Sequence, residues 1–361
     1  MPQVRPEGVV QSTPQVKLLS NIISSVYADL VDTSTSASLA QQARRLALAR
    51  ELDTLVQEGR QDMQAWVDVT VPEFYLQGME RTVNKAIEAG ATIRLDNSYV
   101  RIHRKALNAL VDNGYSQLDN VISSADMFTR QVLDEATKGA ILEEVAKKRI
   151  TGESEDKLST KIEKLIKDRG INRVTTRSGR SYGAKQYGEM LSRTLLTNAQ
   201  VDGTVNQMAM DGHDLVIVSD HFGESDLCRP WENEILSING MYPQYARLET
   251  AKSAGLFRPN CRHVADPYYE EFAKESKVWD ASKQKYVPWS EAEPQNYQRA
   301  VNMSAKDKTK AFQEFTTKIG LADYHQVNNA LQTGDKQKLT YYANKQTGKV
   351  KESILRLKKY L

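Results

Sequence analysis

Apolar residues in the first 150 positions recur at steps of three and four, and this spacing constrains the fold more than any other feature of the chain. One such series begins at residue 16 and consists of Val16, Leu19, Ile22, Ile23, Val26, Tyr27 and Leu30. Residues with this spacing share one face of an α-helix, which can pack against other helices. We therefore expect residues 14–150 to form a helical docking domain, preceded by a flexible arm at residues 1–13, which hold two prolines.

Turn-forming residues are expected to divide this region into several helices. The polar run at residues 32–36 predicts a turn after the first helix, and Gly59 predicts the end of the second. A third helix is expected to start near Gln61, and Pro72 to kink or restart it, because proline has no amide hydrogen to donate. Either the helices form a self-contained domain or part of their apolar surface docks on a partner, and the sequence leaves both open.

The second half of the chain has a different character. A helical pattern that ends at Asp211 and Gly212 is followed directly by the apolar run at residues 215–218, which is typical of a buried strand. Helix followed by strand predicts an α+β fold, in which a long-helix N-terminal half precedes a small mixed α/β, loop-rich module at residues 151–267. Residues 268–361 are expected to form an extended tail, anchored by aromatic side chains and ending in short helices.

Both cysteines and three of the five histidines fall between residues 213 and 267. The predicted strand would deliver His221 and then Cys228 into a loop, to which Cys261 and His263 return after a long excursion. Thiolate and imidazole are the ligands that zinc prefers in a closed structural site, so these four residues are candidate zinc ligands. Neither pair has the Cys-x2-Cys spacing of a zinc ribbon. In the alternative interpretation, the cysteines are small buried residues and the histidines are hydrogen-bonded loop residues.

The same residues also allow a catalytic interpretation, in which a cysteine is a nucleophile and Asp220 or Asp226 orients a histidine. No signature of a thiol enzyme surrounds Cys228 or Cys261. The chain also has no Walker-type phosphate loop, no dinucleotide-binding glycine pattern and no His-Glu-x-x-His motif. We therefore expect a protein that is not an enzyme.

The charge composition gives weak support for nucleic-acid binding. Lys and Arg number 49 and Asp and Glu 46, and the net charge of +3 is too near neutral to indicate a protein that coats nucleic acid. A polar, basic run carries Arg173, Arg177 and Arg180, which could contact a phosphate backbone but is more often a solvated loop. Two cysteines cannot build a disulfide framework, and we expect neither a signal peptide nor a membrane span.

Several short motifs occur in an order and spacing that resemble a known family. They are Ser181-Tyr182-Gly183, Tyr187 through Met190, Arg193-Thr194, Gly212-His213-Asp214-Leu215-Val216, Ser219-Asp220-His221, Cys228-Arg229-Pro230-Trp231 and Pro259-Asn260-Cys261-Arg262-His263. They resemble the tailed-phage minor capsid proteins, most of all the group called phage minor capsid protein 2, over roughly residues 140–270. The chain is more loosely similar to the Mu F-like head morphogenesis proteins, whose last motif ends in Cys where this chain has His263.

The resemblance implies a virion component that is made in the host cytoplasm and is present in few copies. It would lie at the portal vertex or capsid interior, contact the portal or major capsid protein, and in some members travel with the packaged DNA. The alternative that Mu F-like proteins suggest is an effector enzyme, such as a nuclease or an ADP-ribosyltransferase. Residues 268–361 are short and contain a single histidine, His325, so we favour a structural role in head morphogenesis.

Overall fold

The structure of the protein is a computed structural model that describes residues 13–39, 42–89, 91, 93–95, 97–132, 173–175, 179–219, 227–259, 261–269, 277–280, 285–288 and 305–361. The chain divides into two compact units, each assembled from separate stretches of sequence. The unit that we call the helix unit comprises Pro14–Asp68, Asp112–Ser192 and Gly334–Leu361. The sheet unit comprises Met1–Thr13, Val69–Val111 and Arg193–Thr333. The two units are defined by contacts between segments that are distant in the sequence, so they do not correspond to continuous ranges of residues. The domain boundaries expected at residues 13, 150 and 267 therefore stay predictions.

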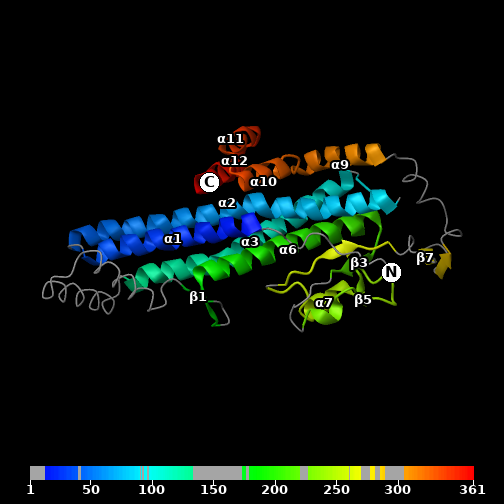
Figure 1. Cartoon of the computed structure of the whole chain (residues 1–361), viewed down its shortest axis with the longest axis horizontal. Helices are drawn as coiled ribbons and strands as arrows, with labels where there is room; N and C mark the ends of the chain where they lie inside the picture. The colour runs from blue at the N-terminus through cyan, green and yellow to red at the C-terminus, as the bar shows by residue number, and fades with distance from the viewer. Residues whose placement is uncertain are drawn as a thin grey trace. The chain divides into compact units, whose positions relative to one another are not determined.

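Long helices build the first half of the chain, as the apolar periodicity predicts. They are α1 (Thr13–Leu39), α2 (Gln42–Ala89) and α3 (Asn97–Val132), and Figure 1 shows α1 running beside the first part of α2. The two helices are tied by the indole of Trp66, which is fully buried and donates a hydrogen bond to the carbonyl of Gln15 at 3.0 Å. None of the described helices combines the length and the apolar character that crossing a bilayer requires.

Three expected interruptions of these helices are wrong: the turn at residues 32–36, the helix end at Gly59 and a restart at Pro72. A kink at Pro72 stays a prediction. Helix α1 continues through residues 32–36, and α2 continues through both Gly59 and Pro72. Gly59 serves close packing and does not end the helix, since a Cβ atom there would lie only 2.6 Å from a methyl group of Val26. Pro72 is flanked by the buried side chains of Val71 and Phe74, and burial of this kind outweighs the lost helical hydrogen bond.

The second half contains the small mixed sheet that an α+β fold requires. Helix α6 (Ala184–Asp211) leads into β3 (Leu215–Val218), which pairs antiparallel with both β4 (Ile235–Ser237) and β6 (Ala265–Pro267). The edge strand β5 (Ala246–Arg247) pairs parallel with β4, so the order is β5-β4-β3-β6. The predicted strand at residues 215–218 is therefore confirmed and is central to its sheet.

Shorter elements complete the second half. The single-turn η1 (Arg229–Trp231) follows Cys228, and α7 (Leu248–Ser253) follows β5. Two antiparallel pairs lie outside the four-stranded sheet. They are β1 (Arg173–Thr175) with β2 (Ser181–Gly183), and β7 (Lys277–Asp280) with β8 (Lys285–Pro288).

Two glycines let α2 and α6 approach backbone to backbone within the sheet unit. A Cβ atom at Gly78 would overlap the carbonyl oxygen of Gln200, and one at Gly203 would overlap the carbonyl oxygen of Tyr75. The hydroxyl of Thr204 donates to the carbonyl of Gly78 at 3.2 Å. Strand β6 is joined to α2 by Asp266, whose carboxylate lies 2.8 Å from Nε of Arg81. These contacts give the sheet a rigid helical support.

The chain ends in a series of short helices. They are α9 (Ala305–Ile319), α10 (Tyr324–Thr333), α11 (Lys336–Lys345), α12 (Gly348–Leu357) and the single-turn η5 (Lys358–Tyr360). Helices α9 and α10 belong to the sheet unit, and α11, α12 and η5 belong to the helix unit.

Candidate metal centre

Three side chains from the loops around β3 meet in the sheet unit. Cys228 begins the turn into η1, where its carbonyl accepts a hydrogen bond from the amide of Trp231 at 2.9 Å. Cys261 closes a second turn, since its amide donates to the carbonyl of Arg258 at 2.9 Å. His263 lies just before Val264, whose backbone is hydrogen-bonded to Ser219 at the end of β3. The sheet therefore fixes where each loop delivers its ligand.

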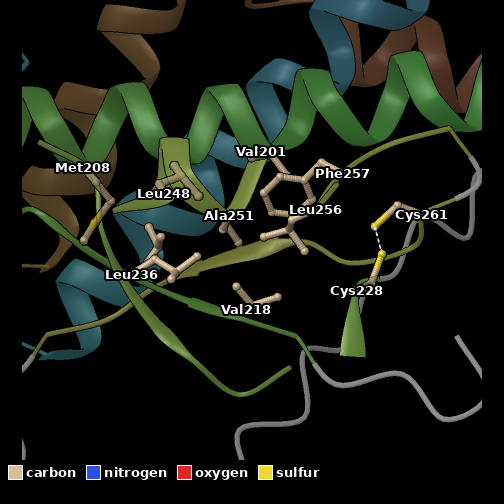
Figure 2. Packing of buried hydrophobic residues seen from close by; sticks show 12 residues of the cluster. Val201, Met208, Val218, Cys228, Leu236, Leu248, Ala251, Leu256, Phe257 and Cys261 are labelled. Atoms are coloured by element: carbon tan, nitrogen blue, oxygen red, sulfur yellow. Dashed lines mark hydrogen bonds between the residues drawn. The ribbon is translucent and has the colours of Figure 1, made fainter. Parts of the chain in front are cut away.

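The distances among these side chains fit a tetrahedral zinc ion. The sulfur atoms of Cys228 and Cys261 are 3.8 Å apart, and Nδ1 of His263 lies 3.3 Å from the sulfur of Cys261 (Figure 2 shows the two cysteines). A tetrahedron with zinc–sulfur distances of about 2.3 Å has sulfur–sulfur edges of about 3.8 Å. The three ligand atoms lie within 4.8 Å of one another, which makes them a candidate metal site.

A carboxylate orients the histidine of this cluster. The Oε1 atom of Glu232 lies 3.0 Å from Nε2 of His263. An ionised carboxylate can only accept hydrogen bonds, so Nε2 carries the proton and Nδ1 keeps its lone pair for the side on which the cysteines lie. Metal-ligating histidines are commonly held in this way by a carboxylate on the other ring nitrogen. The sequence places Glu232 near Cys228 but gives no sign of this pairing.

All three candidate ligands are buried. The exposed fraction is 1% for Cys228, 4% for Cys261 and 0% for His263. Burial is the main reason that the pKa of Cys261 rises from its ordinary value of 9.0 to about 12, and the neighbouring Cys228 adds to the rise. A neutral, enclosed thiol is a poor nucleophile, whereas a metal ion can displace its proton and bind the thiolate. The environment therefore suits metal binding better than the catalytic interpretation.

The cysteines belong to the hydrophobic core between α6 and the sheet. Figure 2 shows most of their partners, which are Val201, Met208, Val216, Val218, Leu236, Leu248, Ala251, Leu256, Phe257 and Ala265. Phe257 has a φ of 60°, a left-handed conformation that is rare for a bulky residue and is tolerated here because packing holds it. The strained turn reverses the chain between α7 and Cys261.

The other predicted site residues have different outcomes. His221, Asp220, Asp226 and Arg177 lie outside the described residues, so a fourth zinc ligand at His221 stays a prediction. Arg173 lies in β1 and Arg180 is exposed just before β2. A phosphate contact by these arginines also stays a prediction.

Comparison with known proteins identifies the family. A family model described as phage minor capsid protein 2 matches residues 47–344, a span that contains most of α2, all of α3 and α6, the mixed sheet and the cysteine–histidine cluster. Searches of curated proteins and of solved structures found no match. The family match covers most of the chain, and it confirms the resemblance carried by the motifs between residues 140 and 270. The chain belongs to the phage minor capsid protein 2 family.

Proposed function

We propose that this minor capsid protein is a structural part of the phage head that docks on the portal or the inner capsid surface during assembly. Family membership supports the virion location. The observation that favours an assembly role is the closed state of the cysteine–histidine cluster, whose three side chains are at most 4% exposed. A cluster that substrate cannot enter is suited to fastening loops and not to turning over a substrate.

In this proposal, Cys228, Cys261 and His263 hold a structural zinc ion. The ion would cross-link the loop that begins η1 to the segment that leads into β6. Joining positions 33 residues apart restricts the unfolded chain and so stabilises the folded module. Because Glu232 already orients His263, the geometry needs little rearrangement to bind the metal.

We assign docking to α1, α2 and α3, the long helices that the structure describes within residues 14–150. Met127 of α3 is 48% exposed and is a candidate contact, since exposed methionines suit adaptable interfaces. Met241, in the loop after β4, has a similar exposed fraction of 46% and provides a matched control. Co-expression with the portal protein and with the major capsid protein of the same phage, followed by affinity purification, tests the assignment.

We expect the wild-type protein and Met241→Glu to co-purify with the partner. Met127→Glu should reduce recovery roughly tenfold, which corresponds to a loss of about 1.4 kcal/mol in binding. Protein recovered free from virion lysates, with no portal or capsid partner, would contradict docking. A zinc-dependent nuclease activity that disappears in Cys261→Ala would instead support the effector-enzyme alternative.

A further inference from the structure

Positive charge is concentrated in the last helices of the chain. Residues 334–361 carry eight Lys and Arg side chains but only two Asp and Glu side chains, a formal side-chain charge of +6. The whole chain has a net charge of only +3, so the remainder is slightly acidic. Basic clusters of this density are the electrostatic signature of surfaces that meet polyanions.

Part of this charge fastens α12 to α2 inside the helix unit. Arg356 lies 3.0 Å from a carboxylate oxygen of the buried Asp62, which also pairs with Lys359. Lys349 lies 3.4 Å from Asp68. These three cations are therefore partly neutralised by α2, and they hold the terminal helices in place.

The lysines of α11 lie on a different surface. Lys338, Tyr341, Tyr342 and Lys345 follow one another at three- and four-residue steps, so they share one face of the helix. The opposite face carries Leu339 and Ala343, both of which are fully buried. We call the four-residue face the α11 basic–aromatic face.

Three side chains of this face are exposed, namely Lys338, Tyr341 and Lys345, and Tyr342 is partly buried. Lys338 lies 3.4 Å from the carboxylate of Asp335, and the other three side chains contact one another. Tyr341 is 57% exposed, the largest fraction among the exposed large apolar side chains of the described residues. Its ring and that of Tyr342 meet edge to face with centroids 5.2 Å apart. The ammonium group of Lys345 lies 4.7 Å from the centre of the Tyr341 ring and 5.3 Å from that of Tyr342. An exposed aromatic surface is thus bordered by ammonium groups.

We propose that the α11 basic–aromatic face binds DNA through its phosphate backbone. Lys338 and Lys345 would neutralise phosphates, and the tyrosines would donate hydrogen bonds to the backbone or stack on an unpaired base. The contact is independent of sequence, as expected for backbone recognition.

The geometry fits DNA better than it fits a bilayer. A helix that lies in a membrane surface needs an available apolar face. Most apolar side chains of these helices, Leu339 of α11 and Ile354 and Leu357 of α12, are buried and cannot insert. Leu355 of α12 is 40% exposed, but a single exposed leucine does not make an apolar helix face. The α11 basic–aromatic face itself presents lysine and tyrosine, which match phosphate, base and sugar chemistry.

Fluorescence anisotropy with the full-length protein tests the proposal, using a labelled 25-base-pair duplex of random sequence and the matching single strand. The test variant is Lys338→Glu/Lys345→Glu. The control is Lys306→Glu/Lys310→Glu, which makes the same charge change at two exposed lysines of α9. Thermal melting of both variants checks that they are folded, and Tyr341→Ala probes the same face without altering its charge.

We expect the α11 double variant to raise the Kd for DNA at least tenfold at about 100 mM salt and to lower the salt slope by roughly two phosphate contacts. The α9 control should change the Kd by less than threefold. Tyr341→Ala should weaken binding of the single strand more than binding of the duplex. Equal weakening by both double variants would overturn the proposal, because net charge alone would then explain binding. Binding of polyglutamate without binding of DNA would also overturn it and would assign the face to an acidic protein.

Discussion

Nε2 of His263 lies 3.0 Å from the carboxylate of Glu232, and this contact directs the other ring nitrogen toward the cysteine pair. Replacing Glu232 with Gln removes the charge that fixes the histidine proton but keeps the shape of the side chain. We expect zinc affinity to fall about 10- to 100-fold, as is typical when a carboxylate behind a metal-bound histidine is lost. Competition with a chromophoric chelator measures the affinity. Glu234→Gln, an exposed neighbour, is the control and should bind zinc as the wild type does.

Removal of a ligand should have a larger effect. Cys261→Ser keeps the size of the buried side chain but replaces a soft thiolate with a hydroxyl, which is a poor zinc ligand. Elemental analysis should give about one zinc per chain for the wild type and much less for the variant. A chelator should lower the melting temperature of the wild type and leave that of the variant nearly unchanged. Wild-type protein without zinc after purification in metal-replete buffer would contradict the site.

The sequence indicates this centre only in part. Its cysteines and histidines are the one cluster of soft ligands in the chain, so Cys228, Cys261 and His263 could be selected without a structure. The roles of Glu232 and of the strained Phe257 could not, because they depend on how two loops fold back on β3. Long-range loop geometry leaves no periodic signal in the residues themselves.

The boundaries of the helices could also be predicted only in part from the sequence. Periodicity located them well, but Gly59 predicts a helix end and Pro72 a kink or restart, whereas α2 runs through both. Both errors arise because local propensity was given priority over packing. Gly59 is small because Val26 presses against it, and this contact between residues on separate helices is visible only in three dimensions.

Glycine packing gives a prediction that distinguishes two kinds of contact within α6. Gly203→Ala would drive a methyl group into the backbone carbonyl of Tyr75, which cannot move without separating the helices. Gly188→Ala would meet the terminal methyl of Ile23, which can rotate aside. We expect Gly203→Ala to lower the free energy of unfolding by about 1–3 kcal/mol or more. Gly188→Ala should change it by less than about 1 kcal/mol, because alanine favours the helix. Urea denaturation measures both, and equal losses would contradict the packing argument.

The contribution of His325 to stability should depend on pH. Hydrogen bonds to Glu73 and then to Glu80, each at 2.7 Å, raise the pKa of His325 from 6.5 to about 10, against an opposing effect of burial. A raised pKa means that the folded state holds the proton more tightly. The contribution is therefore complete below pH 6.5, declines as pH rises, and is lost above about pH 10.

His325→Gln removes this contribution and its pH dependence. The difference in melting temperature between wild type and variant should be largest near pH 6.5 and should shrink steadily toward pH 10. A parallel titration by NMR should show the imidazole of the wild type still protonated at pH 8. A difference that stays constant from pH 6.5 to 10 would show that His325 contributes only by packing.

The buried carboxylate of Asp62 should control whether the terminal helix stays attached within the helix unit. It accepts hydrogen bonds from Arg356 at 3.0 Å and from the hydroxyl of Tyr360 at 2.6 Å, and its own exposed fraction is 1%. Asp62→Ala removes both bonds and the ion pair with Lys359, and leaves the guanidinium with its hydrogen bond to Gln61. The loss should cost about 1–3 kcal/mol locally.

Hydrogen exchange provides the measurement, because local unfolding of α12 exposes its amides without unfolding the rest of the protein. Amides of residues 348–357 should exchange at least about tenfold faster in Asp62→Ala, since 1.4 kcal/mol corresponds to a factor of ten. Asp53→Ala, at an exposed position of the same helix, should leave these rates unchanged. Faster exchange throughout α2 in Asp62→Ala would instead mean that the carboxylate stabilises its own helix, so that the loss of α12 is secondary.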